Sequence, residues 1–199
     1  MKILLRAFAI AVALTGSSCL TTMSPQTASA MYLQGVGTGP VQSDPLGIDK
    51  VSYWDGDGMS GAPSIHIRLS EQKAYFFKGG TLAGVSMIAS GRENFESPSG
   101  KFKIIQKNKD HHSNLYGEIL DASGTVINKD ADIKKDPVPP GGRFVGAPMP
   151  YFMRIHGGVG MHVGFLPGYA ASHGCIRMPE KMAMKFWENA PLGTPVWVE

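Results

Sequence analysis

The chain has 199 residues, of which 43% are hydrophobic and 18% are charged, and its formal net charge is +3. This length and composition support a folded core in one domain with a preceding leader, or in at most two small domains, and they exclude wholesale disorder. The positive charge is weak and scattered, with no dense run of lysine and arginine, so no nucleic-acid partner is expected. The 25 glycines and 14 prolines favour short strands joined by turns over a helical bundle.

Residues 1–30 have the pattern of an export leader. A positively charged start precedes a short apolar run ending at Leu14, which is too short to span a bilayer. Two cleavage points stay open. Cleavage after the A-x-A sequence that ends at Ala30 gives a soluble exported protein, whereas a leader of residues 1–18 would resemble a lipoprotein signal and make Cys19 a lipid anchor. Both interpretations place the mature chain outside the cytoplasm, in the periplasm or cell envelope.

Residues 31–63 are rich in glycine, proline, serine and aspartate, and they are predicted to form a linker or an extended arm. The domain proper is expected over residues 64–199. Alternating apolar residues predict its first strands at 64–69, 74–78, 82–89 and 101–104.

Residues 110–136 are polar and are predicted to be irregular, with a turn at 122–124, and 137–142 are predicted to form a loop. Strands are expected again at 151–155 and 159–163, joined by a two-glycine turn, and at 196–198. One helix is predicted over 179–189, because proline suits its first turn and apolar residues follow at helical spacing. The predicted fold class is therefore mainly β, a sandwich or barrel with one short helix.

Cys175 is the candidate nucleophile. If Cys19 leaves with the leader, Cys175 is the one thiol of the mature chain, although a lone cysteine can also be a small buried residue. A thiol with a pKa near its usual value of about 8.5 is mostly protonated at neutral pH, so it needs a base or a positive field. The predicted helix would supply a field through its N-terminal dipole. The backbone N–H groups of Gly174 and Cys175 would form an oxyanion hole.

Two side chains near the thiol have alternative roles. Arg177 is expected either to hold a substrate carboxylate or to lock the turn by hydrogen bonds to carbonyls. Ser172 is a candidate cap of the same turn. A zinc site is not expected, because the spacing of His156, His162 and His173 relative to the cysteine matches no common ligand pattern.

The base that takes the thiol proton must be a histidine. With a two-residue turn at 157–158, His162 pairs with Met153 and shares the more apolar, hence interior, face of the hairpin. His156 then lies on the opposite face. We therefore expect His162 to be the base, with His156 as the alternative, since a one-residue slip in register would exchange the faces.

The run from Met161 to Gly164, followed by the run from Ser172 to Met178, resembles the L,D-transpeptidase catalytic domain family, whose signature is a histidine, a loop and then S-H-G-C-x-R. Similar elements occur at residues 67–74, 90–91, 97–100 and 194–196, so the resemblance covers about 64–199. Nine residues separate His162 from Ser172, fewer than is usual for the family, whereas fifteen separate His156 from Ser172. His162 still fits better, because it follows the glycine turn and precedes a small residue.

The resemblance implies a β-sandwich-like domain and a two-step acyl transfer on peptidoglycan stem peptides. Cys175 would attack the carbonyl before the terminal D-alanine of a tetrapeptide stem, and His162 would carry the proton, with its ring oriented by the carbonyl of Val163. The residues expected to shape the turn and oxyanion hole are Ser172, His173, Gly174 and Arg177. An amine would resolve the thioester, and the resemblance implies no cofactor, no metal and no stable protein partner.

Two other functions stay open. A hydrolase of the L,D-carboxypeptidase or amidase type would use water as the acceptor, and a short loop over the site would favour it by admitting water. A non-catalytic cell-wall-binding module would not need the thiol.

Overall fold

The computed structural model describes residues 43–199. The predicted leader, both of its cleavage points and the candidate anchor Cys19 lie outside the described residues. Within the described range, no helix is long and apolar enough to cross a membrane.

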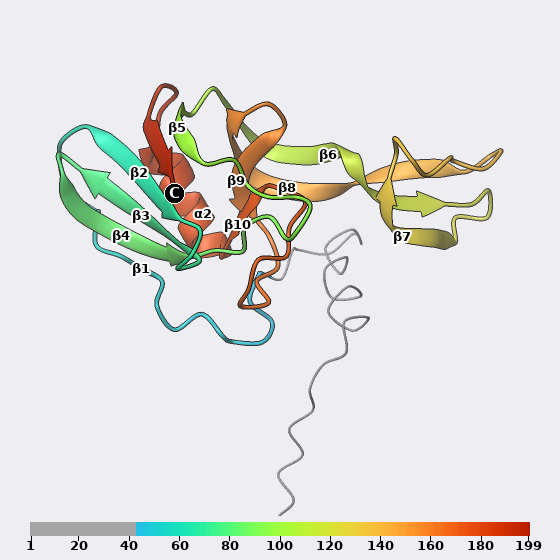
Figure 1. Ribbon diagram of the computed structural model, residues 1–199, viewed down its shortest axis with the longest axis horizontal. Helices are drawn as coiled ribbons and strands as arrows, with labels where there is room; N and C mark the ends of the chain where they lie inside the picture. Colours follow the sequence, from blue (N-terminus) through green and yellow to red (C-terminus); the bar gives the residue numbers. More distant parts are fainter. Residues whose placement is uncertain (1–42) are drawn as a thin grey trace, which may run out of the picture.

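The described chain forms two β-sheets and a short helix (Figure 1). The six-stranded sheet has, in spatial order, β1 (Tyr53–Trp54), β4 (Thr81–Met87), β3 (Lys73–Lys78), β2 (Pro63–Arg68), β11 (Pro195–Val198) and β5 (Gly100–Lys103). The five-stranded sheet has, in spatial order, β10 (Ile176–Met178), β9 (Val159–Val163), β8 (Arg143–His156), β6 (Gln106–Leu120) and β7 (Val126–Asp132). The helix is α2 (Glu180–Asn189). The predicted fold class, mainly β with one short helix, is confirmed.

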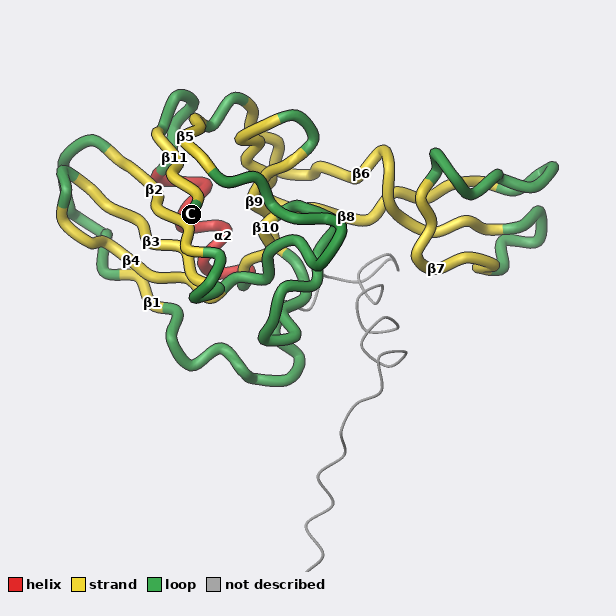
Figure 2. Tube along the Cα trace, in the orientation of Figure 1, coloured by secondary structure: helices red, strands yellow, loops and turns green. Residues whose placement is uncertain are grey.

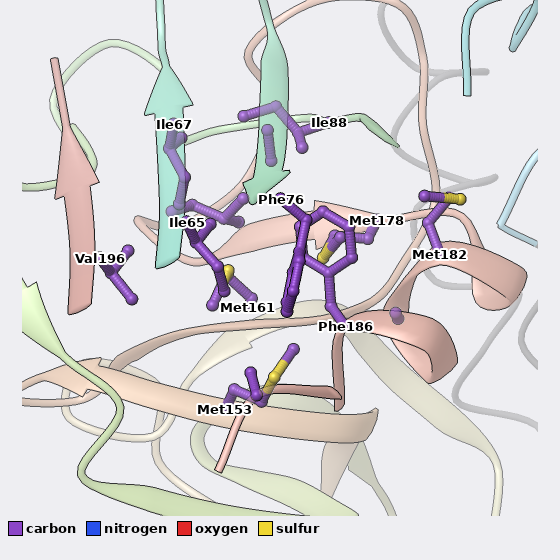
Figure 3. Close-up of a cluster of buried hydrophobic side chains, with 14 of the residues drawn as sticks. Ile65, Ile67, Phe76, Ile88, Met153, Met161, Met178, Met182, Phe186 and Val196 are labelled. Carbon is purple, nitrogen blue, oxygen red and sulfur yellow. The ribbon is translucent and has the colours of Figure 1, made fainter. Parts of the chain in front are cut away.

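The core lies between the two sheets and α2, as Figure 3 shows. Alternate residues of each strand face it, so Ile65 and Ile67 of β2 are fully buried while the residues between them are not. The helix contributes Phe186, whose ring meets that of Phe76 edge to face at 5.0 Å. Each such large apolar side chain contributes about 1.5–3 kcal/mol when it is removed from water.

The predicted arm joins the six-stranded sheet at its end. β1 pairs with β4, and Trp54 packs against Phe76 at 5.2 Å between ring centroids. Trp54 also lies 6.2 Å from the ring of Phe186. The last residues before position 64 therefore belong to the same packed body as the strands that follow.

The prediction of an irregular segment at 110–136 is wrong. These residues form most of β6 and β7, which together with β8 extend away from the rest of the molecule (Figures 1 and 2). The turn expected at 122–124 is present, with the Gly124 N–H donating to the carbonyl of Asp121 at 3.0 Å. Apolar alternation is missing from this sequence because an extended hairpin with few buried residues does not need an apolar face.

Candidate active site

Cys175 lies directly before β10, which runs parallel to β9 with Ile176 opposite Met161. This register places the cysteine beside Gly160. The Sγ atom is 3.8 Å from the carbonyl oxygen of Gly158, and the backbone N–H of Gly160 also points at the sulfur. The thiol therefore faces the backbone of the hairpin between β8 and β9, at its glycine turn.

Glycine at position 160 is required by a close approach. A Cβ there would lie 2.5 Å from the ring of Phe152 and 2.6 Å from the carbonyl oxygen of Met153. No real Cβ fits at such distances, so the absence of a side chain lets the backbone of β9 approach β8 this closely.

His162 stands two residues after Gly160, on the same face of β9, and pairs with Arg177. The predicted turn is present, since His156 pairs with Val159, but a bulge after Arg154 changes the register. Met153 therefore pairs with Met161, and the prediction that His162 shares a face with Met153 is wrong. His162 lies instead on the outer face of this sheet, opposite to the core, with its ring 6.3 Å from that of Phe152.

The corrected face still places His162 diagonally across from Cys175. Neighbouring strands are about 4.8 Å apart and two residues advance about 6.6 Å, which gives roughly 8 Å between the two Cα atoms. The imidazole is only 6% exposed, and its Nδ1 lies 2.7 Å from the carbonyl oxygen of Val163. Because that carbonyl can only accept, Nδ1 carries the proton and Nε2 is left as the basic nitrogen.

The resting pair is neutral. Burial lowers the pKa of His162 to about 3, an effect that the bond to Val163 opposes and that nearby Arg177 and His111 reinforce. Burial also raises the pKa of the Cys175 thiol, although the Gly160 N–H and the two arginines Arg177 and Arg154 act in the other direction. The site therefore holds a thiol beside a neutral imidazole.

The expectation that a helix N-terminus activates the thiol is wrong. β10 separates Cys175 from α2, and the side chains that α2 buries belong to the core. The first helical N–H, that of Glu180, donates to Ser43 Oγ at 3.1 Å. The positive end of the helix is thus directed at another part of the chain.

The nucleophile turn is held by its own serine. Ser172 Oγ accepts the N–H of Gly174 at 3.0 Å and donates to the carbonyl of Cys175. The predicted oxyanion role of the Gly174 N–H is therefore contradicted, because that donor is already bonded within the turn. Gly174 has φ +105°, a conformation that favours glycine. Among the two predicted donors, the N–H of Cys175 remains the candidate.

A second layer of residues, whose roles the sequence did not reveal, supports this turn. Ser97 Oγ donates to the carbonyl of Gly174 at 2.8 Å and accepts the N–H of Gly91 at 2.9 Å. The carbonyl of Ser90 accepts the N–H of Ser172 at 2.9 Å, and Gln72 holds Ser90 in place through two hydrogen bonds, at 2.7 and 2.9 Å. The elements at 67–74, 90–91 and 97–100, which resemble those of the family, were the only signal of these residues in the sequence.

Arg177 is buried and binds carbonyls of the preceding loop. Its guanidinium donates to Phe165 O at 3.4 Å and to Ala171 O at 3.2 Å. Of its two expected roles, the locking role is the one that these contacts provide. The loop is also tied to the arm, because the Leu166 N–H donates to the carbonyl of Ser43 at 2.8 Å.

His173 contacts the extended hairpin. Its ring stacks on that of Tyr116 at 4.3 Å, Arg92 donates to its Nε2 at 2.7 Å, and Asp130 lies 3.6 Å away. Burial and the adjacent Arg92 lower the pKa of His173 to about 4, and Asp130 opposes this shift. His173 therefore anchors the nucleophile turn on β6 and β7.

The alternative base, His156, is exposed at the end of β8, with its ring 5.3 Å from that of Phe102. β9 lies between β8 and β10, so His156 is separated from the thiol by a strand. Over residues 43–199, no group of three or more histidine, cysteine or acidic side chains is arranged to hold a metal ion.

Comparisons with known proteins agree on one family. The model of the L,D-transpeptidase catalytic domain matches residues 62–198. A cysteine-to-serine mutant of an Enterococcus faecium L,D-transpeptidase is 26% identical with a TM-score of 0.50, covering 70% of this chain and 50% of that one. L,D-transpeptidases from Mycobacterium smegmatis and Xylanimonas cellulosilytica share the fold at 17% and 20% identity, each with a TM-score of 0.51.

The extent of these matches differs. The M. smegmatis comparison covers 70% of this chain and 59% of the other, and the X. cellulosilytica comparison covers 88% and 70%. The chain thus spans only about half to three fifths of the first two solved structures. No curated protein sequence matches the chain.

Proposed function

The chain belongs to the L,D-transpeptidase catalytic domain family, and we propose that it is a cysteine acyltransferase that acts on peptidoglycan stem peptides. One observation carries the proposal. Cys175 and His162 share the outer face at the β9–β10 pair, and the bond from Nδ1 to the Val163 carbonyl leaves Nε2 with the free lone pair. The neutral imidazole has a lone pair that can accept the thiol proton as the sulfur attacks.

The first half-reaction forms a thioester. The Cys175 sulfur attacks the carbonyl carbon before the terminal D-alanine, and His162 Nε2 takes the thiol proton as the S–C bond forms. The oxyanion accepts a hydrogen bond from the Cys175 N–H. When the intermediate collapses, the C–N bond breaks, His162 returns the proton to the leaving amine, and D-alanine departs.

The second half-reaction transfers the acyl group. An acceptor amine attacks the thioester while His162 takes one of its protons, and collapse breaks the C–S bond. The same proton then returns to sulfur and restores the neutral pair. Both half-reactions use one histidine in alternating roles, so no cofactor enters the scheme.

A hydrolase on the same scaffold is the second candidate. The loop between His162 and Ser172 is short and tied down by Arg177, and the Cys175 residue is only partly buried. Water that reaches the thioester would compete with the amine. A wall-binding module without catalysis is the third reading, and it predicts that the thiol is dispensable.

Export is also part of the proposal, supported by the pattern of residues 1–30. Attachment of a lipid at Cys19 would place the mature chain on a membrane, whereas cleavage after Ala30 would release it. Metabolic labelling with a fatty acid, compared between the natural sequence and Cys19→Ala, separates the two: label that depends on Cys19 supports the anchor.

Mass spectrometry of the mature chain with a disaccharide tetrapeptide and an excess of a D-amino acid tests the activity. Cross-linked dimers or exchanged terminal residues, absent with Cys175→Ala, are the expected products. Shortened stems alone, again absent with Cys175→Ala, would instead support the hydrolase. If Cys175→Ala still forms these products, a catalytic role of the thiol is refuted.

A further inference from the structure

The solvent-facing side of the six-stranded sheet carries a row of side chains that crosses every strand. The pairing register aligns one residue from each strand at the same level. In spatial order, the row is Tyr53, Val85, Tyr75, His66, Trp197 and Lys101. Because paired residues share a face and their chain neighbours face the core, all six side chains point to the outer side of the sheet, although Val85 is only 7% exposed.

The row contains four aromatic side chains, and two of them are well exposed. Trp197 is 45% exposed and Tyr53 is 42% exposed. His66 meets Trp197 edge to face at 5.1 Å, and the Lys101 ammonium lies 4.5 Å from the centre of the indole. A shallow groove runs beside Trp197. The core does not need this indole, because Val196 and Val198 of the same strand fill the inner side.

The charge around the row is positive at its β5 end. Lys101 and Lys103 alternate with inward residues and stand on the outer face. The nearby carboxylates of Glu71 and Glu199 are both bound by Arg68, at 2.9 and 3.2 Å. The face thus combines aromatic rings with two lysines that form no ion pair within residues 43–199. Lysine is depleted in protein–protein interfaces. This face therefore suits a second copy of the chain less well than a polymer of small units that carries negative charges.

The β5 end of the row adjoins the active site. β5 begins three residues after Ser97, whose hydroxyl donates to the Gly174 carbonyl, so Lys101 lies at most about 14 Å of extended chain from Ser97. Phe102 of β5 contacts His156, at the end of the hairpin whose Gly158 carbonyl faces the thiol. Because the row and the thiol lie on the outer faces of different sheets, a ligand would pass from the row to the nucleophile turn around the β5 edge.

We propose that this row binds the glycan strand of peptidoglycan and holds the polymer while its stem peptide enters the active site. Pyranose rings have an apolar C–H face and a rim of hydroxyls, which suit the exposed rings of Trp197 and Tyr53 because each ring carries a polar group at its edge. Carboxylates of the stem peptides would lie near Lys101 and Lys103. The inference rests on the proposed function, since it names where the substrate polymer is held.

Binding to insoluble cell-wall sacculi tests the proposal separately from catalysis. The mature Cys175→Ala chain is co-sedimented with purified sacculi, with and without Trp197→Ala or Tyr53→Ala. Loss of one aromatic contact is expected to weaken binding about 2- to 12-fold. Ile127→Ala, at a 54% exposed position on the distant hairpin, is the matched control and should bind like its parent. Lys101→Glu should weaken binding further and reduce its dependence on salt.

Activity on a soluble disaccharide tetrapeptide is measured in parallel with the Cys175-containing chain. Trp197→Ala is expected to leave this activity unchanged while it lowers activity on sacculi. Unchanged sacculus binding in the Trp197→Ala, Tyr53→Ala and double variants overturns the proposal. So does a dimer in solution that Trp197→Ala dissociates, because the face is then a self-interface. Absence of any turnover by the natural chain refutes the proposed function, whereas Trp197-dependent binding would still support this surface.

Discussion

The neutral state of the catalytic pair predicts how the thiol reacts with an alkylating agent as pH changes. With the pKa of His162 at about 3, only about one imidazole in a thousand is protonated at pH 6. Burial raises the pKa of Cys175 above its usual value, so the thiolate is a minor species throughout the neutral range. The rate of alkylation by iodoacetamide should therefore rise about tenfold for each pH unit between 6 and 8.

The measurement is the pseudo-first-order rate of carbamidomethylation at Cys175, followed by mass spectrometry from pH 5 to pH 9. A histidine-paired thiolate would instead give a rate that is flat between pH 5 and pH 7, and such a plateau would refute the neutral pair. His162→Ala supplies the control. It should leave the slope of the alkylation profile unchanged while it lowers turnover on a stem peptide by about 10²–10⁴-fold, the usual contribution of a general base.

Three further predictions follow from the buried groups and close contacts of the site. The pKa values of His162 and His173 are lowered to about 3 and 4, so the unfolded chain binds more protons than the folded chain below pH 6.5. The free energy of unfolding should therefore fall by up to about 1.4 kcal/mol per pH unit for each histidine as the pH drops toward 4. Urea midpoints that stay constant from pH 7 to pH 5 would contradict this. Gly160→Ala should lower the free energy of unfolding by about 1–3 kcal/mol and abolish turnover, because the added Cβ meets the Phe152 ring and the Met153 carbonyl. Gly158→Ala is the control for thermal unfolding. Its Cβ has open space around it, so its stability should stay within about 0.5 kcal/mol of the parent. Ser97→Ala should lower the free energy of unfolding by about 1–3 kcal/mol and also lower kcat, since it leaves the buried Gly174 carbonyl without its donor. Ser99→Ala, at an exposed position, serves as its control. Equal kcat in both variants would show that Ser97 does not position the turn.

The sequence by itself determined the local elements and the chemistry of one segment. Strands such as β2 and β3 bury one face, and their alternation of apolar and polar residues was visible without a structure. The helix at 180–189 was visible from proline and the spacing of its apolar residues. The run from Ser172 to Arg177 carries a reactive residue type within a specific local pattern, so the family was recognisable from those letters.

Only the tertiary structure decided which groups surround the thiol. The bulge after Arg154 places His162 on the outer face. A bulge is a backbone irregularity that the apolar pattern of the sequence does not indicate. β10 separated Cys175 from the helix dipole, which left burial to set the thiol pKa. Ser97 binds Gly174 and Ser90 binds Ser172, each across more than seventy residues of chain, and Gln72 holds Ser90 in place. Such hydrogen bonds between distant segments depend on how the sheets pack and not on local residue spacing.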